Sequence, residues 1–169
     1  MSQASLCFIL QGDRVLLIRK KRGVGAGKIN GPGGKVEAGE TMADSAVRET
    51  REEIGVTPLD LELRGELFFD FVGSHQVHCG VFIARGMDGD PKETAEATPM
   101  WHAIDAMPYD EMWDDDRAWF PLLLAGKYFR GGATVDPGDK VRGVYAEEVD
   151  PAALAASCGL PLRAVGRVA

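Results

Sequence analysis

Three glutamates, Glu49, Glu52 and Glu53, are spaced so that a helix would carry them on one side, three and four positions apart. Like charges at this spacing destabilise a helix by roughly 0.2–0.5 kcal/mol per pair. Carboxylate oxygens are ligands that Mg²⁺ and Mn²⁺ prefer, usually together with phosphate oxygens of a substrate. The cluster therefore indicates either a divalent-cation site or a solvated acidic face, which is the common role of charge runs.

The residues around the glutamates predict the helix that would position them. Thr41 and Asp44 have the spacing of a capping box, and Gly55 stands where a left-handed residue would end the helix. An apolar stripe at helical spacing runs between these ends and consists of Ala43, Ala46, Val47, Thr50 and Ile54. We therefore expect a helix that packs this stripe on a core and presents the glutamates beside it.

The remaining elements predict an α/β fold. Apolar runs at 5–10 and 15–18 flank a polar turn, so a hairpin is expected there, and 61–72 and 78–84 are expected to form a second strand pair. In the first strand of that pair, Leu67, Phe69 and Phe71 alternate with the other face. Short strands are expected at 100–104, 127–129 and 141–149, and a second helix at about 117–125. Strands in mixed order with helices on opposite faces predict an α/β/α sandwich with a mixed β-sheet.

Length and composition narrow the class of protein. The chain has 169 residues, 45% of them hydrophobic, and a formal net charge of −7. An acidic chain is a poor partner for long nucleic acid, which favours basic surfaces. Cys7, Cys79 and Cys158 are odd in number and widely spaced, which is typical of reduced, packed thiols in a cytoplasmic protein. Neither a secretory signal nor an apolar run of membrane-spanning length is evident, so we expect a cytoplasmic protein with no membrane partner. No heptad or large apolar surface stripe is visible, so we expect a monomer.

The last part of the chain differs in composition. From Pro151 it is rich in Ala and Leu and contains no acidic residue. We expect one domain at 1–150 and an extension at 151–169. The extension is either a short docked helix or a loosely held tail.

The segment Gly34–Val56 resembles the Nudix box. The chain has Gly34, five residues, Glu40, seven residues and Arg48-Glu49, and then Glu52-Glu53 with Gly55. Thr50 in an aliphatic position is the single departure. KKRGVGAGKINGPGGKVEAGET, FFDFVG and MWDDDRAWFPLLLAGKYFRG resemble segments of animal MutT homologues, over about 5–150. The resemblance implies the Nudix fold and Mg²⁺-dependent hydrolysis (Mn²⁺ as an alternative ion) of an oxidised purine nucleoside triphosphate such as 8-oxo-dGTP to monophosphate and pyrophosphate.

The resemblance also implies which residues hold the metal. The carboxylates of Glu49, Glu52 and Glu53 match the ligands, and the carbonyl of Gly33 is an additional one. Glu96 matches a distal glutamate that completes the site, although an acid in a polar loop needs no such role. Glu53 and Glu96, in that order, are the candidates to take a proton from water, and Glu49 is placed with them in the catalytic set. Glu40 and Arg48 match an ion pair that orients the loop and helix.

The substrate site implied by the resemblance combines a base pocket with a phosphate contact. Its residues are Ser5, Lys20, Asn30, Phe69, Trp113, Asp115 and Asp116. Two close carboxylates rarely both ionise, so Asp115 and Asp116 could offer one donor and one acceptor to a purine edge. Acidic residues before a helix also favour its start, which is the alternative for Asp114–Asp116. Lys20 could equally be a surface charge, and Trp119 and Phe120 are expected in the core.

Several features leave the substrate open. Val24, Ile29, Pro32 and Val77 differ from the pocket or loop residues of the related enzymes, which puts the base preference in doubt. The Gly-rich loop lacks the spacing of a P-loop, since Ile29 follows Gly27-Lys28. His75, His78 and His102 have no metal-ligand spacing. The alternatives are a Nudix enzyme for ordinary or alkylated nucleotides or dinucleotides, and an inactive nucleotide-binding regulator.

Overall fold

The structure is a computed structural model, and it describes residues 1–166. Its strands are β1 (Ser2–Gln11), β2 (Arg14–Lys20), β3 (Ile29–Asn30), β4 (Gly33–Lys35), β5 (Thr57–Leu59), β6 (Glu62–Phe71), β7 (His75–Ala84), β8 (Gly86–Asp88), β9 (Ala97–Ala103), β10 (Phe129–Asp136) and β11 (Lys140–Glu148). Its helices are α1 (Met42–Ile54), α2 (Asp116–Leu124) and α3 (Pro151–Ser157), with short 3₁₀ turns η1 (Tyr109–Glu111) and η2 (Leu162–Val165).

Most strands belong to one large mixed sheet. Their order is β11-β10-β6-β7-β1-β2-β3, with β4 paired to β1 and β9 paired to β2. β1 runs parallel to β7, and β10 runs parallel to β6, whereas the remaining pairs are antiparallel. β5 and β8 form a separate pair. The predicted mixed sheet is confirmed.

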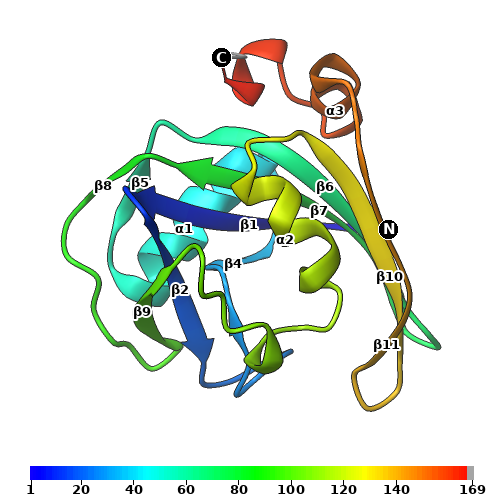
Figure 1. The fold of residues 1–169 in the computed structure, drawn as a ribbon, viewed down its shortest axis with the longest axis horizontal. Helices are drawn as coiled ribbons and strands as arrows, with labels where there is room; N and C mark the ends of the chain where they lie inside the picture. Colours follow the sequence, from blue (N-terminus) through cyan, green and yellow to red (C-terminus); the bar gives the residue numbers. More distant parts are fainter. Residues whose placement is uncertain (167–169) are drawn as a thin grey trace.

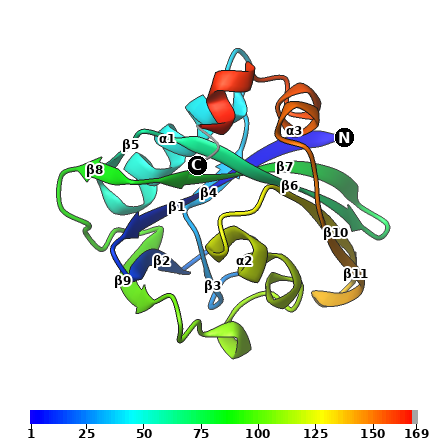
Figure 2. The same cartoon turned by 45° about the horizontal axis from the view of Figure 1, so that its top comes forward.

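Helices cover both faces of this sheet, as predicted. Figure 2 shows α1 and α3 on one side of β6 and β7, with α2 on the other. One core contains Met42 and Ala46 of α1 together with Leu154 of α3, and the other contains Trp119 and Phe120 of α2. In Figure 1 the C-terminal segments lie beyond the end of the sheet, next to β6. Within residues 1–166, no helix has the length and apolar character needed to span a membrane.

Helix α1 has the predicted ends. The Thr41 hydroxyl accepts from the Asp44 N–H at 3.1 Å, and the Asp44 carboxylate accepts from the Thr41 N–H at 2.9 Å. Gly55 ends the helix with φ 74°, in the left-handed region that glycine adopts without strain. The predicted helix and its capping box are therefore confirmed, and they fix where the glutamates emerge.

The other predicted elements are mostly present. β1 with β2 and β6 with β7 are the two predicted antiparallel pairs, and β9 and β11 cover the predicted strands at 100–104 and 141–149. The strand predicted at 127–129 is wrong in its bounds, because β10 continues through Gly131 and Gly132 to Asp136. Glycine normally weakens a strand, but an added Cβ at Gly132 would lie 2.2 Å from the Phe68 carbonyl oxygen. A close strand contact therefore requires glycine there.

The described part of the C-terminal extension is a docked helix. Asp150 accepts hydrogen bonds from the first turn of α3, and Pro151 occupies the first turn, where its missing N–H costs nothing. Leu154 and Val165 are buried against the sheet, and the Tyr128 hydroxyl donates to the Val165 carbonyl at 3.1 Å. The alternative of a loosely held tail is wrong for 151–166, and 167–169 lie outside the described residues.

Candidate active site

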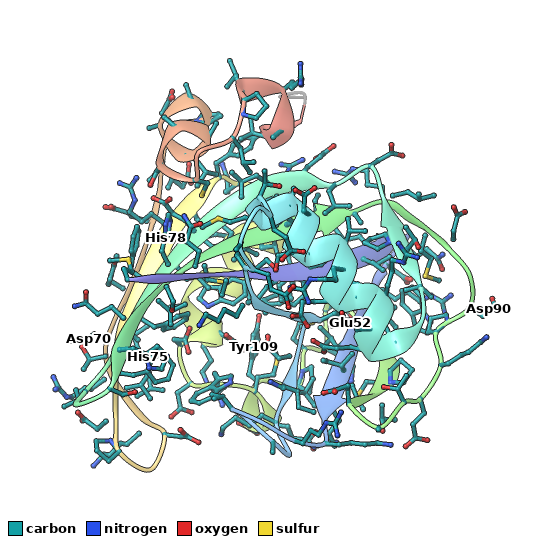
Figure 3. The ribbon with its side chains drawn as sticks, turned by 180° about the vertical axis from the view of Figure 1, so that it is seen from behind. Glu52, Asp70, His75, His78, Asp90 and Tyr109 are labelled. Atoms are coloured by element: carbon teal, nitrogen blue, oxygen red, sulfur yellow. The ribbon has the colours of Figure 1, made fainter. Side chains whose placement is uncertain are left out.

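The predicted glutamate cluster lies where α1 approaches β4. Glu53 is only 6% exposed, and its Oε1 accepts from the Gly33 N–H at 3.3 Å. Glu49 lies against Gly34, where an added Cβ would be 2.6 Å from its carboxyl group. Glu52 is at the rim, with a side chain 57% exposed, and is labelled on the surface of α1 in Figure 3. The exposure of the three carboxylates therefore increases from Glu53 through Glu49 to Glu52.

Arg48 connects this cluster to the preceding loop. Its Nη1 lies 2.9 Å from Glu49 Oε1 and 3.2 Å from Glu52 Oε2. Its Nε and Nη2 donate to the two oxygens of Glu40 at 2.7 and 3.0 Å, and Nη2 also donates to the Lys35 carbonyl. The predicted Glu40–Arg48 ion pair is confirmed. Arg48 also relieves part of the repulsion between Glu49 and Glu52.

Burial and a neighbouring negative charge determine the pKa of Glu53. Burial, with a smaller contribution from the Glu49 charge, raises the pKa of Glu53 to about 8, although the Gly33 N–H and the Lys20 charge oppose the rise. A buried carboxylate beside a second one is a donor set that a divalent cation would stabilise in its ionised form. Within residues 1–166 the three glutamates do not form a group of ligand atoms within 4.8 Å of one another, since Glu49 and Glu52 are bound to Arg48. Their oxygen ligands have the chemistry that Mg²⁺ or Mn²⁺ prefers, and holding the ion stays a prediction for Glu49, Glu52 and Glu53.

Glu96 lies apart from the buried carboxylates. Its side chain is 42% exposed and forms an ion pair with Arg22, which holds the pKa of Glu96 below its usual value. The segment is nevertheless tied to α1, because the Glu96 N–H donates to the Thr94 hydroxyl, which donates to the Glu53 carbonyl at 2.7 Å. A metal role for Glu96 stays a prediction, and the structure pairs its carboxylate with Arg22.

All the predicted substrate contacts line one pocket between β1, β6, β7 and the start of α2. The pocket is lined by Ser5, Lys20, Asn30, Phe69, Trp113, Asp115 and Asp116, and Gly33 and Gly34 of β4 complete its wall. Because Gly33 and Gly34 also contact the glutamates, the pocket and the candidate metal site share this strand. Residues far apart in sequence thus meet around one cavity.

Asp115 and Asp116 are both buried in this pocket, at 2% and 3% exposure. Trp119 Nε1 donates to Asp115 Oδ2 at 3.0 Å, whereas Asp116 Oδ2 has no hydrogen-bond partner among residues 1–166. Burial raises the pKa of Asp115, and burial together with the Asp115 charge raises the pKa of Asp116 well above its ordinary value. Asp115 makes no side-chain capping bond to α2. Asp115 is nevertheless the N-cap residue and Asp116 lies in the first turn, so the acidic start of the helix is present beside the pocket role. The pair can offer one donor and one acceptor.

The mouth of the pocket is formed by the Gly-rich loop and Trp113. An added Cβ at Gly25 would lie 3.1 Å from Trp113 Nε1, so the loop lies against the indole. Lys28 Nζ lies 5.1 Å from the centre of the indole ring. Lys20 Nζ donates to the Val24 carbonyl at 2.8 Å, which fixes a positive charge at the pocket wall. The loop therefore brings Lys20 and Val24 together with Trp113 at the pocket wall.

The sequence interpretation missed some of the lining. Leu67 and Phe71 share the pocket face with Phe69, and the strand alternation was a signal that could have identified them. His75 also lines the pocket and stacks on Phe71 with ring centres 4.9 Å apart. Trp119 was expected in the core; it is 1% exposed but also forms the pocket wall. Only the fold reveals these last two roles.

Comparisons with known proteins agree with this geometry. The family model described as "NUDIX domain" matches residues 2–123. The chain is 44% identical to the oxidized purine nucleoside triphosphate hydrolase of Mus musculus over 149 residues, covering 86% of this chain and 94% of that protein. It is 46% identical to the protein of the same name from Danio rerio over 130 residues, covering 75% and 82%.

A solved structure is also similar. The MutT protein from Bacillus halodurans matches with a TM-score of 0.77 and 25% identity, covering 87% of this chain and 98% of that one. The fold, the glutamate helix and the family match agree. The chain belongs to the Nudix family of hydrolases.

Proposed function

We propose that this chain hydrolyses oxidised or otherwise modified purine nucleoside triphosphates, of the 8-oxo-dGTP type, to the monophosphate and pyrophosphate. The carrying observation is that a buried aspartate pair, Asp115 and Asp116, lines a pocket whose β4 wall also contacts Glu49 and Glu53. Such a pocket can place a base at one end and phosphates at the other. The names of the mouse and zebrafish relatives support the same substrate class.

Recognition of the base rests on the two aspartates. Asp116 has the more strongly raised pKa and an unpartnered oxygen, so it keeps its proton and donates. Asp115, held by Trp119 Nε1, accepts. A purine 6-oxo group needs a donor, and the N1–H needs an acceptor, so the pair complements the edge that ordinary and 8-oxidised guanine share. Moving the proton to Asp115 would complement a 6-amino edge, and Trp113 and Phe69 offer aromatic surfaces for the ring.

Hydrolysis needs charge neutralisation and a proton acceptor near the phosphates. We propose that Glu49, Glu52 and Glu53, with the Gly33 carbonyl and Glu96, hold Mg²⁺, with Mn²⁺ as an alternative. When bound, the cation neutralises phosphate oxygens and acidifies a water. Lys20 lies at the pocket wall and can bind a phosphate oxygen.

Glu53 is the preferred proton acceptor among the carboxylates. It is the most buried of the three glutamates and lies against Gly33 of the pocket wall. Burial raises its pKa in the metal-free protein, and a bound cation would keep the carboxylate ionised and able to accept a proton. Glu96 has a lowered pKa because of Arg22, so it is a weaker base. The Gly33 N–H orients one oxygen of Glu53 and leaves the other to take up the proton.

The domain organisation, the cellular location and the oligomeric state are part of the proposal. We infer that residues 1–150 form the catalytic domain and that 151–169 are an extension of it. The net charge of −7 favours a small nucleotide over long nucleic acid, and the buried free cysteines within residues 1–166 fit the reducing cytoplasm. We infer a monomer, since the sequence has no heptad pattern and no large apolar surface stripe.

The test is pyrophosphate release by the full chain with Mg²⁺ across a panel of nucleotides. The panel contains 8-oxo-dGTP, 2-hydroxy-dATP, O6-methyl-dGTP, the four ordinary dNTPs, ADP-ribose and a diadenosine polyphosphate. We expect kcat/KM for a modified purine to exceed that for dGTP by at least about tenfold, the difference of one good hydrogen bond. Preference for an ordinary nucleotide or a dinucleotide would overturn the substrate, and no turnover at all would favour a binding regulator.

A further inference from the structure

A second polar cluster lies outside the pocket, between β6, β7 and the end of α3. It consists of Glu66, His78 and Cys158, whose ligand atoms all lie within 4.8 Å of one another. Glu66 Oε2 is 3.0 Å from His78 Nε2 and 3.4 Å from Cys158 Sγ, and this sulfur is 4.0 Å from His78 Nε2. Three groups that bind transition metals therefore converge on one point.

The cluster is separated from the pocket by the sheet. Leu67 of β6 and Val77 of β7 line the pocket, so Glu66 and His78, their neighbours in the strands, point to the opposite face. In Figure 3 His78 lies below α3, away from Glu52 on α1. The cluster is thus distinct from the proposed catalytic metal site.

Each member of the cluster is buried and held in place. Glu66 is 0% exposed, His78 7% and Cys158 5%. Arg130 Nε donates to Glu66 Oε1 at 2.6 Å, which leaves Oε2 directed at the other two groups. The His78 ring stacks on Phe68 with centres 4.4 Å apart and planes within 3° of parallel. These contacts hold the carboxylate and the imidazole in place beside the Cys158 sulfur.

We propose that Glu66, His78 and Cys158 form a zinc site that fastens the C-terminal extension to the sheet. Ligands of a tetrahedral Zn²⁺, at about 2.0–2.3 Å from the ion, lie roughly 3.3–3.6 Å from each other. The three observed separations of 3.0, 3.4 and 4.0 Å bracket that range. A thiolate and an imidazole select zinc over Mg²⁺ or Ca²⁺, and water can occupy the fourth position.

Binding would change the protonation of the thiol. In the metal-free cluster, burial and then the Glu66 charge raise the pKa of Cys158 above its ordinary value, so the sulfur carries a proton. Zn²⁺ replaces that proton, which is released to solvent, and forms a Zn–S bond without any change of oxidation state. Arg130 places a positive charge beside Glu66. The negative charges of the thiolate and of the Glu66 carboxylate offset the positive charges of Arg130 and the ion.

The consequence is a cross-link between distant parts of the chain. Cys158 is 92 positions from Glu66 and 80 from His78. A metal joining them would hold α3 on β6 and β7, and the binding free energy would add to the stability of the fold.

The test uses Co²⁺ as a spectroscopic substitute for Zn²⁺ in the chelator-treated, reduced full chain. We expect one equivalent of Co²⁺ to produce a thiolate-to-cobalt charge-transfer band, which one equivalent of Zn²⁺ removes. Zn²⁺ is also expected to raise the Tm. Cys158→Ser should abolish the band, and His78→Gln should weaken Zn²⁺ binding by at least about tenfold.

Matched controls separate this site from the other thiols and from the catalytic carboxylates. Cys7→Ala removes a buried thiol on another strand and should retain the band, as should Glu53→Gln, which alters the proposed catalytic site. Absence of the band in the wild-type chain, or its persistence in Cys158→Ser, would overturn the zinc site and leave a hydrogen-bond network. The result does not depend on turnover, so it stands or falls separately from the proposed function.

Discussion

At the scale of single residues, burial has the same effect on two groups of carboxylates and supports two different roles. It raises the pKa of Glu53 to about 8 and raises those of Asp115 and Asp116 as well. A buried carboxylate that a bound cation keeps ionised can take a proton from water, which is the role proposed for Glu53. One that stays protonated can donate a hydrogen bond to a base, which is the role proposed for Asp116.

Glu53→Gln tests the proton-acceptor role. Glutamine keeps the shape and an oxygen for the Gly33 N–H, so the fold should persist, but it cannot take a proton or carry a charge. We expect kcat to fall by about 10²–10⁴-fold, the usual contribution of a general base. Pyrophosphate release and circular dichroism measure the two properties. Glu147→Gln, which changes an exposed glutamate of β11, is the control, and wild-type kcat in Glu53→Gln would contradict the assignment.

Glu53 also predicts how stability depends on pH in the metal-free protein. Its folded pKa of about 8 lies above the value of 4.5 for an ordinary glutamate, so the folded state binds more protons between these limits. The free energy of unfolding therefore falls as pH rises from about 4.5 to 8, by up to about 1.4 kcal/mol per pH unit from this group. Urea unfolding in chelator at pH 5.5 and 8 measures it. The fall should be smaller in Glu53→Gln, and equal falls in both proteins would refute the burial effect.

Asp115→Ala tests the base-reading pair. The variant removes the acceptor for the substrate and leaves the Trp119 Nε1–H unpaired, at a cost of about 1–3 kcal/mol in stability. We expect kcat/KM for the preferred modified purine to fall about 10–100-fold, with a smaller change for dCTP and dTTP, which present no purine edge. Asp114→Ala, at the exposed neighbouring position, should behave as wild type. Unchanged turnover of the preferred substrate in Asp115→Ala would show that the base is read elsewhere.

At the scale of elements, local patterns predicted some parts of the site and missed others. The capping box and Gly55 fixed α1, because both signals act within one turn of the helix. β4 is three residues long and its pairing with β1 is non-local, so the pattern of Gly33 and Gly34 carried no strand signal. The resemblance to the Nudix box supplied the role of Gly33 instead. In the structure β4 lines the pocket and lies against the glutamates of α1.

Gly34→Ala tests how closely β4 and α1 must approach. The added Cβ would lie 2.6 Å from the Glu49 carboxyl group, the far end of a flexible side chain. Moving that end costs little stability, but it displaces a predicted ligand, and a shift of about 1 Å can cost 10²-fold in rate. We expect a fall in kcat of at least about tenfold with a Tm near that of the wild type.

Gly86→Ala in β8 is the control for this substitution. Its Cβ would make an ordinary contact of 3.8 Å with Leu59, outside the pocket lining. Both its kcat and its Tm should be near the wild-type values. If Gly34→Ala were equally neutral, the approach of β4 to Glu49 would be irrelevant to catalysis.

At the scale of the whole molecule, the extension shows what the sequence could not predict. Its composition allowed a helix or a tail, because docking depends on contacts with β6 and β7 that no local pattern records. The sequence predicts Glu66 within a strand. Its burial depends on contacts with His78, Arg130 and Cys158, which come from other parts of the chain. Long-range pairing of polar groups, unlike helix capping, has no signature in a single sequence.

If the extension is part of the cooperative fold, a buried residue within it should be as sensitive as any core residue. Leu154 is 0% exposed, so Leu154→Ala should lower the free energy of unfolding by about 2–5 kcal/mol. A protein of this size loses roughly 2–4 °C of Tm per kcal/mol, so the change is measurable by a thermal melt. Leu162→Ala, in the same extension but 59% exposed, is the matched control and should change stability by less than about 0.5 kcal/mol.

The same two variants also separate stability from catalysis. The extension and the pocket lie on opposite faces of the sheet, so we expect both proteins to keep the wild-type kcat well below their Tm. A single transition at lower temperature in Leu154→Ala would mean that 151–166 unfold with the sheet. An unchanged melt would mean that α3 detaches without affecting the fold, and loss of kcat in the folded variant would connect the extension to the pocket.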